Sequence, residues 1–203
     1  MSVLGVVMAG GRNTRFGDLK AFAVVEGERI IDRVIAALRA VADDVVLSAN
    51  DAAAYASVPL PSRPDVTPDL GALGGLHTAL RWAAERGHQG ILAVACDMPF
   101  PSERLLSRLL ESVAEYDAVL PESDGRRGVE PLFAYYSINC LPAIEQAMAR
   151  DDRRMIGFHR DISVQRIPIE DVRTYGDPEI LFMNVNSRED LERAQRIARE
   201  QRA

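Results

Sequence analysis

Residues 3–20 read VLGVVMAGGRNTRFGDLK. The first six, Val3 to Met8, form an apolar run without polar alternation, which is typical of a β-strand covered on both faces. The run stops at Ala9 and passes into Gly10-Gly11, where the missing side chains leave backbone amides unshielded. The stretch therefore predicts a buried strand followed by a loop whose N–H groups suit an anion such as phosphate.

The same alternation continues along the chain and predicts its architecture. Short apolar runs are separated by stretches with apolar residues at helical spacing, which predicts a three-layer α/β/α fold with a mostly parallel, Rossmann-like sheet. Because a domain has about 150 residues, we expect 1–203 to form a single domain. The predicted strands cover residues 3–8, 45–47, 91–95, 118–120 and 132–136, and the predicted helices cover 30–38, 73–80, 105–110 and 189–199, the last with Ser187 as its N-cap. The proline-rich segment 59–64 is predicted to be a rigid connection.

Composition narrows the class of protein. The 203 residues carry a formal charge of −6, which disfavours a sequence-independent nucleic-acid binder. The two cysteines indicate reduced thiols in an intracellular protein. No apolar run approaches the roughly 18 residues of a membrane span, and no secretory leader is present. We therefore expect a soluble, cytoplasmic protein with neither a nucleic-acid nor a membrane partner.

The glycine loop is followed by positive charge. Arg12, Arg15 and Lys20 would place three cations beside the amides of Gly10 and Gly11, and Lys20 is the single lysine among 24 basic residues. No Gly-Lys-Ser/Thr follows, which excludes a P-loop, and a G-x-G-x-x-G dinucleotide fingerprint is absent as well. An ordinary glycine turn with a solvated basic loop is the alternative.

The order Ala-Gly-Gly-Arg-x-x-Arg-Phe-Gly-x-x-Lys resembles the signature of the nucleotidylyltransferase superfamily, and within it that of the molybdenum cofactor guanylyltransferases. Later segments extend the resemblance over nearly the whole chain. The further matches are Leu47 to Asn50, Asp65 with 71–76, Ala95 to Phe100, Glu130 to Ala134, Arg153 to Met155 and Phe182 to Leu191. The departures from the family pattern are Asp18, displaced by one position, Ser48 in place of Asn, and Ala72 and Arg188 in place of Pro.

The resemblance implies a nucleotide-diphospho-sugar transferase type of fold and a definite reaction. GMP would be transferred from GTP to the phosphate of molybdopterin, with release of pyrophosphate. Residues 1–100 would bind the NTP and residues 101–203 the acceptor. Mg²⁺ would be required, and transient contacts with proteins that deliver the cofactor are possible partners.

Site residues follow from the matched motifs. Lys20, Arg15 and Asp97 would be catalytic, and Asp97 would hold Mg²⁺ together with Asn186 because hard oxygen ligands suit that ion. Asp65 would accept the two N–H donors of guanine, and Arg153 with Arg154 would bind the acceptor phosphate. The implied nucleotide-binding residues are Met8, Ala9, Gly10, Gly11, Arg12, Lys20, Asn50, Asp65, Gly74, Gly75 and Asp97.

Several alternatives stay open at this level. Asp97 could instead cap the helix that follows it, although Ser102 is the better cap; Asp65 could form an Asx-turn after Pro64, and Asn186 a turn before the last helix. The rival functions are a CTP-dependent molybdopterin cytidylyltransferase, a transferase acting on a sugar or cobamide phosphate, and a nucleotide-binding partner without catalysis.

Overall fold

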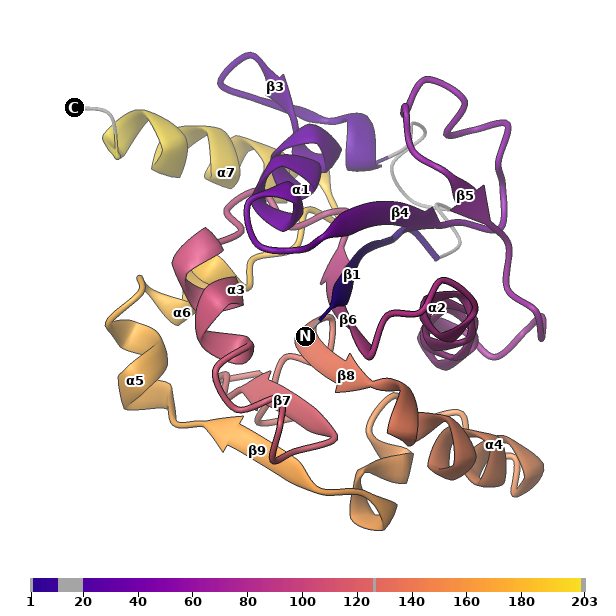
Figure 1. Cartoon of the computed structure of the whole chain (residues 1–203). Coiled ribbons are helices and arrows are strands. Elements are labelled where there is room, and N and C mark those ends of the chain that lie inside the picture. The colour runs from indigo at the N-terminus through magenta and orange to yellow at the C-terminus, as the bar shows by residue number, and fades with distance from the viewer. Residues whose placement is uncertain (1, 11–19, 126, 202–203) are drawn as a thin grey trace.

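A computed structural model of the chain describes residues 2–10, 20–125 and 127–201. A twisted seven-stranded sheet runs through the molecule in the order β5-β4-β1-β6-β8-β7-β9 (Figure 1). Strands from both halves of the sequence belong to this one sheet. Its strands are β1 (Val3–Met8), β4 (Asp44–Ser48), β5 (Ser62–Arg63), β6 (Gly90–Ala95), β7 (Ala118–Pro121), β8 (Phe133–Ser137) and β9 (Val164–Ile167).

The sheet is mostly parallel, as predicted. Strand β1 pairs in parallel with β4 and with β6, and β4 pairs in parallel with β5. Strand β8 runs antiparallel to both β6 and β7, while β7 and β9 are again parallel. A single reversed strand therefore separates the parallel strands of the N-terminal half from those of the C-terminal half.

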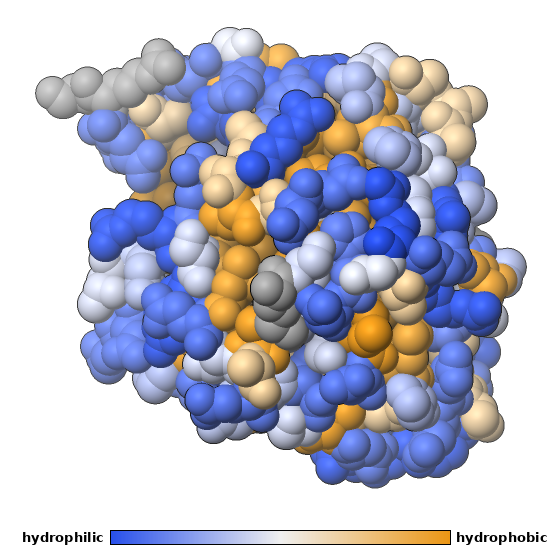
Figure 2. All heavy atoms as spheres, in the orientation of Figure 1, coloured by the Kyte–Doolittle hydropathy of each residue, from blue (hydrophilic) through white to orange (hydrophobic). Residues whose placement is uncertain are grey.

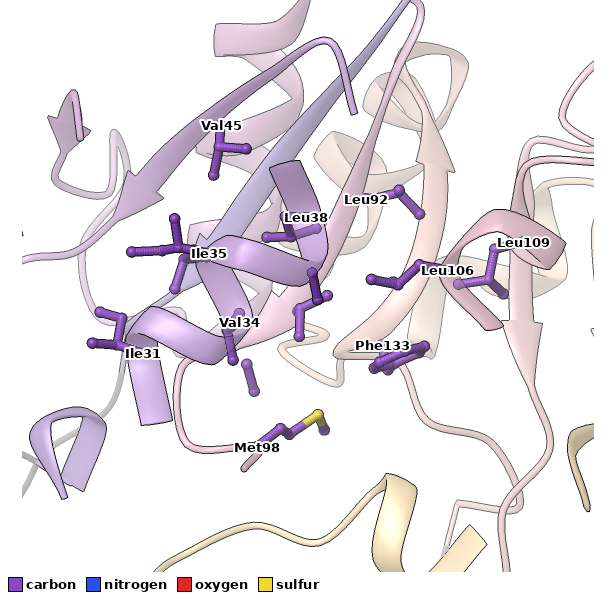
Figure 3. Close-up of a cluster of buried hydrophobic side chains, with 14 of the residues drawn as sticks. Ile31, Val34, Ile35, Leu38, Val45, Leu92, Met98, Leu106, Leu109 and Phe133 are labelled. Atoms are coloured by element: carbon purple, nitrogen blue, oxygen red, sulfur yellow. The ribbon is translucent and has the colours of Figure 1, made fainter. Parts of the chain in front are cut away.

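Helices cover both faces of the sheet and produce the predicted three layers (Figure 1). Helices α1 (Ile30–Arg39) and α3 (Glu103–Leu109) pack on one face, and α2 (Ala72–Glu85) and α4 (Leu141–Ala149) pack on the other. Figure 3 shows the first of these cores, in which α1 and α3 direct side chains such as Leu38 and Leu106 toward the sheet.

Strand β1 explains why an uninterrupted apolar run was a reliable signal. Val3 and Val7 join the core under α1 and α3, while Leu4 and Val6 join the core under α2 and α4. Alternate residues of a strand point to opposite faces, so a strand covered on both sides needs apolar residues at every position. Gly5 lets α1 approach closely, because a Cβ there would lie 3.2 Å from Leu38 Cβ.

Smaller elements complete the chain. A two-stranded hairpin of β2 (Val24–Val25) and β3 (Glu28–Arg29) packs against the C-terminal helix, and Val185 fills the corner between them. The Ser187 hydroxyl caps that helix, as predicted. The C-terminal helix is α7 (Arg188–Glu200). The remaining short helices are η1 (Lys20–Phe22), η2 (Ile138–Cys140), η3 (Gly157–Asp161), α5 (Ile169–Arg173) and α6 (Pro178–Leu181).

The predicted strands and helices are confirmed, with boundaries within a few residues. The interpretation of 59–64 as only a rigid connection was incomplete, since Ser62–Arg63 pairs with β4 as a short edge strand. Strand β9 was missed because the polar residues Gln165 and Arg166 interrupt any apolar run; only Ile167 at its end is buried.

The molecular surface is polar over most of the face in Figure 2, with apolar side chains gathered in a strip between α1 and α3. A cavity of about 420 Å³ lies near this strip, between α1, the segment after β6 and the segment 175–181. None of the predicted site residues that the structure describes lines it. Within the described part of the chain, no helix is both long and apolar enough to cross a bilayer.

Candidate active site

The carboxyl ends of three neighbouring parallel strands bring the predicted nucleotide-binding segments together. Residues Ala9 and Gly10 follow β1, Asn50 lies just beyond β4, and Asp97 lies just beyond β6. The Ala9 N–H donates to the Ser48 carbonyl at 2.9 Å, and the Cys96 N–H donates to the Met8 carbonyl at 3.1 Å. Ligands of open α/β sheets bind at this edge. Gly11, Arg12 and Arg15 lie outside the described residues.

Gly10 presents an open backbone to solvent. Among the described residues, no atom lies within 4 Å of a Cβ added at Gly10, so none of these residues requires glycine at this position. A glycine whose side-chain space is vacant leaves its amide accessible to a molecule that approaches from outside. The phosphates of a nucleotide would fit that space.

Asn50 and Asp65 form one unit on the α2 side of the site. The Asp65 N–H donates to Asn50 Oδ1 at 2.7 Å, and Asn50 Nδ2 donates to Asp65 Oδ2 at 2.9 Å. This reciprocal pair fixes the Asp65 carboxylate, which retains a second oxygen and further lone pairs for a ligand.

The glycines of α2 allow the helix to approach that carboxylate. A Cβ at Gly75 would lie 3.0 Å from Met8 Cε and 3.5 Å from Asp65 Oδ1, and one at Gly74 would lie 3.0 Å from the Thr67 carbonyl oxygen. A larger residue at either position would require its neighbours, such as Met8 or the Thr67 carbonyl, to shift by a few tenths of an ångström. Both glycines therefore shape the site through packing.

Asp97, Lys20 and Asn186 gather at the other side of β1. Lys20 Nζ donates to Asn186 Oδ1 at 2.7 Å, although the two residues lie 166 positions apart. The Val185 N–H donates to the Asp97 carbonyl at 2.9 Å and thereby ties the segment before α7 to the end of β6. The structure thus brings these three residues into one corner.

Burial raises the pKa of Asp97 above its ordinary value, and the Lys20 ammonium opposes this by lowering it. A half-buried carboxylate of this kind is stabilised by a cation. Burial similarly raises the pKa of the neighbouring Cys96 to about 12, so this thiol stays protonated and is no nucleophile at neutral pH.

The oxygens of Asp97 and Asn186 fit a divalent metal ion. A carboxylate and an amide carbonyl are hard ligands of the type that Mg²⁺ takes from proteins, with phosphates and water completing its shell. The Lys20 ammonium donates to Asn186 Oδ1 and lowers the pKa of Asp97, so it already supplies positive charge to these two oxygen-bearing side chains. Within the described residues, no cluster of three or more His, Cys, Asp or Glu side chains forms a separate metal site.

Arg153 and Arg154 lie apart from this corner. Arg153 Nε donates to Asp151 at 2.8 Å and its Nη1 to the Asp69 carbonyl at 3.4 Å. The guanidinium of Arg154 makes two hydrogen bonds with the Asp152 carboxylate, and its backbone N–H makes a third. Among the described residues, neither arginine forms a hydrogen bond or ion pair with Lys20 or Asp97. Both guanidinium groups are largely exposed, and that of Arg153 contacts the loop that leads into α2.

Glu130 is a candidate site residue that the sequence did not single out. It precedes β8, and burial raises the pKa of its carboxyl. The Leu132 N–H and the positive charge of Arg127 oppose this effect, and the negative charge of Asp97 adds to it. It lines a cavity of about 380 Å³ together with Phe182 and Asn184. The sequence signal was present in the matched Glu130-Pro131 segment, but nothing local shows that this residue lies near Asp97.

The fold and the gathered polar groups are typical of enzymes that bind nucleotides at the carboxyl edge of a sheet, and comparison with known proteins defines the class as nucleotidyltransferases. Residues 5–163 match the family described as the MobA-like NTP transferase domain. The chain belongs to this family.

Named relatives align over the full length. A probable molybdenum cofactor guanylyltransferase of Pelotomaculum thermopropionicum is 34% identical over 202 residues, covering 100% of this chain and 96% of the relative. A molybdenum cofactor guanylyltransferase of Desulfosudis oleivorans is 32% identical, covering 96% and 95%. The crystal structure of molybdopterin-guanine dinucleotide biosynthesis protein A from Archaeoglobus fulgidus superposes with a TM-score of 0.80 at 25% identity, covering 98% of this chain and 100% of that one.

Proposed function

We propose that this enzyme transfers GMP from GTP to the phosphate of molybdopterin, giving molybdopterin guanine dinucleotide and pyrophosphate in the cytoplasm. The observation that carries the proposal is the convergence of the Gly10 backbone, Lys20, Asp97 and Asn186 at one edge of the sheet, in a chain whose full-length relatives are named guanylyltransferases. Residues 1–100 supply most of the NTP site, and residues 101–203 supply the acceptor site and Asn186.

The reaction is a substitution at the α-phosphorus of GTP. An oxygen of the acceptor phosphate forms a bond to that phosphorus, and the bond to the β-phosphate oxygen breaks, so that pyrophosphate leaves with the bonding electrons. Because the acceptor phosphate is already ionised near neutral pH, the chain's task is to align two anions and offset their repulsion. No residue has to remove a proton from the nucleophile.

We assign each candidate site residue a part in this alignment. The Gly10 amide and the Lys20 ammonium bind phosphate oxygens, and the Asp65 carboxylate, fixed by Asn50, accepts the N1–H and N2–H of guanine. Asp97 and Asn186 would hold Mg²⁺, which when bound neutralises charge on the phosphates. We also assign Gly11, Arg12 and Arg15 to the phosphates, and Arg153 with Arg154 to the acceptor phosphate, as predictions from the sequence.

The direct test measures pyrophosphate release with GTP, CTP, ATP and UTP in turn, with and without molybdopterin. We expect release that requires both GTP and molybdopterin. Faster pyrophosphate release with CTP than with GTP would show that the enzyme is a cytidylyltransferase. Release from no NTP would indicate a nucleotide-binding protein without catalysis, and transfer in the presence of a sugar phosphate alone would indicate a different acceptor. Contacts with cofactor-delivery proteins stay a prediction.

A further inference from the structure

The segment between β5 and α2 carries Asp65 and has no fully buried side chain. Residues 64–71 connect the edge strand to the helix along the rim of the molecule (Figure 1). Every one of these residues is at least partly exposed, and the apolar side chain of Val66 is 57% exposed. Because no side chain of this segment is anchored in the core, its conformation depends on hydrogen bonds to neighbouring elements.

Two hydrogen bonds hold the peptide groups on either side of Asp65. The Asp65 N–H donates to Asn50 Oδ1 at 2.7 Å, just beyond β4, and the Val66 N–H donates to Thr78 Oγ1 at 2.8 Å, in α2. The first bond holds the peptide plane before the Asp65 Cα, and the second holds the plane after it. Since only two soft backbone dihedrals lie between these planes, the two bonds set the direction in which the Asp65 side chain leaves the backbone.

The Asp65 carboxylate lies over the first turn of α2, close to the position of Thr78. A Cβ added at Gly74 would lie 3.4 Å from Asp65 Oδ2, and one at Gly75 would lie 3.5 Å from Oδ1. Thr78 follows Gly74 by about one helical turn, so both contact the same segment from one face of the helix. The helix therefore borders the carboxylate and also holds the backbone that carries it.

Thr78 is an unfavourable residue for the core unless its hydroxyl has a function. It is 2% exposed and lies between His77 and Ala79, which are also buried. A hydroxyl taken out of water costs free energy unless it is hydrogen-bonded, and valine offers the same branched shape without that cost. Packing alone therefore gives no reason for threonine at this position, whereas the bond to the Val66 N–H does.

We infer that Thr78 is a positioning residue for recognition of the nucleotide base. Its buried hydroxyl holds the Val66 N–H and, together with Asn50, orients the Asp65 carboxylate toward the N1–H and 2-amino groups of guanine. Thr78 touches no substrate and acts through Asp65. This inference rests on the proposed function and adds the residue that sets the geometry of base recognition.

The test uses inosine triphosphate (ITP), which keeps the N1–H of guanine and lacks its 2-amino group. Wild-type enzyme should prefer GTP over ITP by about tenfold or more in kcat/KM, the effect of one charge-assisted hydrogen bond. Thr78→Val removes the hydroxyl and keeps the side-chain shape. It should reduce this preference to about threefold or less and raise KM for GTP roughly five- to thirtyfold. The kcat at saturating GTP should stay within about threefold, because the phosphate and metal residues are unchanged.

Two further variants separate positioning from stability. Thr78→Ser retains the hydroxyl and should keep the GTP preference, although the loss of a buried methyl group should lower its melting temperature by a few degrees. Ser137→Ala is the matched control, because Ser137 Oγ is also buried and accepts a backbone N–H, that of Asn139, at 3.1 Å. Ser137 pairs with Gly90 at the start of β6, at the opposite end of that strand from Asp97, so this variant should keep the preference.

Amide hydrogen exchange measured by NMR reports on the hydrogen bond without turnover. In the protein without nucleotide, the Val66 N–H should exchange about tenfold or more faster in Thr78→Val than in wild type. In Thr78→Ser it should exchange near the wild-type rate, because the serine hydroxyl can accept the same bond.

The outcomes keep this inference apart from the proposed function. Wild-type protein that releases no pyrophosphate with GTP and molybdopterin would overturn the proposed function. Wild-type protein that transfers GMP but uses GTP and ITP equally well would remove Asp65 from base recognition, and the role of Thr78 with it.

Where wild type does prefer GTP, three results would overturn the role of Thr78 alone. The first is a Thr78→Val enzyme that keeps the preference or the wild-type exchange rate of the Val66 N–H. The second is a Thr78→Ser enzyme that loses the preference as fully as Thr78→Val. The third is an equal loss in Ser137→Ala, which would assign the effect to general destabilisation.

Discussion

At the scale of single residues, the candidate site contains a few groups that differ in how closely they are packed and how far they are buried. A Cβ at Gly10 would have no neighbour within 4 Å among the described residues, whereas Gly75 is packed against Met8. Asp97 is a half-buried carboxylate beside Lys20. Substitutions at these positions should therefore act on different properties. A change at Gly75 alters packing, whereas changes at Gly10 and Asp97 should alter substrate and metal binding in a protein that remains folded.

Gly10→Ala should leave stability unchanged and weaken GTP binding. The added methyl meets no atom of the described residues within 4 Å, so the free energy of unfolding should change by no more than about 0.5 kcal/mol. If the α- and β-phosphates lie against this backbone, KM for GTP should rise by roughly tenfold or more. Urea denaturation and GTP titration measure the two effects separately.

Gly90→Ala provides the contrasting control. Its Cβ would lie 2.5 Å from Tyr135 Oη, so this variant should lose about 1–3 kcal/mol of stability through overpacking in the core. An unchanged GTP constant in a folded Gly10→Ala protein would remove Gly10 from the phosphate site.

Asp97→Ala should abolish metal-dependent turnover while the fold is retained. Removing a half-buried carboxylate whose pKa is raised by burial eliminates an unfavourable desolvation, so the variant should unfold at a temperature no lower than wild type by more than a few degrees. Turnover should fall roughly a hundredfold or more, and Mn²⁺ binding in the presence of GTP should weaken in parallel. Wild-type Mn²⁺ affinity in the variant would show that Asp97 is not a ligand.

At the scale of elements, the last helix positions Asn186. Asp190 Oδ2 accepts hydrogen bonds from the backbone N–H groups of both Asn186 and Ser187, each at 2.9 Å, and Ser187 Oγ accepts from the Asp190 N–H at 3.1 Å. This capping box begins α7 and simultaneously holds the backbone of Asn186. The helix therefore contributes to the site through its N-terminal cap.

Asp190→Ala and Ser187→Ala should separate these two roles. Each removes part of the cap and should lower the free energy of unfolding by about 1 kcal/mol. Asp190→Ala should in addition raise the Mg²⁺ concentration needed for half-maximal turnover, by roughly threefold or more, because only Asp190 holds the Asn186 N–H. Metal titration of both variants is the measurement, and equal Mg²⁺ requirements would assign Asp190 to stability alone.

At the scale of the whole molecule, the free energy of unfolding should depend on pH through a buried histidine that has no role in the proposed site. His159, in η3, packs against Phe158 with ring centroids 4.8 Å apart, and its Nε2 is buried without a hydrogen-bond partner among the described residues. Burial lowers the pKa of His159 to about 4, and the positive charge of Arg166 acts in the same direction. This histidine is therefore neutral in the folded protein at every pH above about 4.

The stability of the folded state should consequently fall in mild acid. An unfolded histidine has a pKa of about 6.5, so between pH 6.5 and 4 the unfolded chain binds a proton that the folded chain excludes. The contribution of His159 is fully present above pH 6.5 and is lost as the pH falls toward 4. Between pH 7.5 and 5 the loss should amount to roughly 1–2 kcal/mol.

His159→Phe isolates this contribution, since it keeps an aromatic ring in the same packing and removes the titrating group. Urea denaturation of both proteins at pH 7.5 and at pH 5 gives four free energies of unfolding. The variant should lose roughly 1–2 kcal/mol less than wild type between the two pH values. Equal losses in the two proteins would show that His159 is readily protonated in the folded state.

The sequence by itself determined the layered α/β fold, the buried strands and the segments that follow their carboxyl ends, because burial on both faces of a strand is written in consecutive residues such as Val3 to Met8. It also pointed to Lys20, Asp65, Asp97 and Asn186 through recognisable local motifs. Only the tertiary structure decided the strand order, the reversed direction of β8 and the edge strand β5, because pairing depends on how distant segments satisfy their hydrogen bonds together. The contact between Lys20 and Asn186 and the position of Glu130 beside Asp97 arise in the same way, since local sequence patterns report burial and capping but do not specify which distant side chains meet.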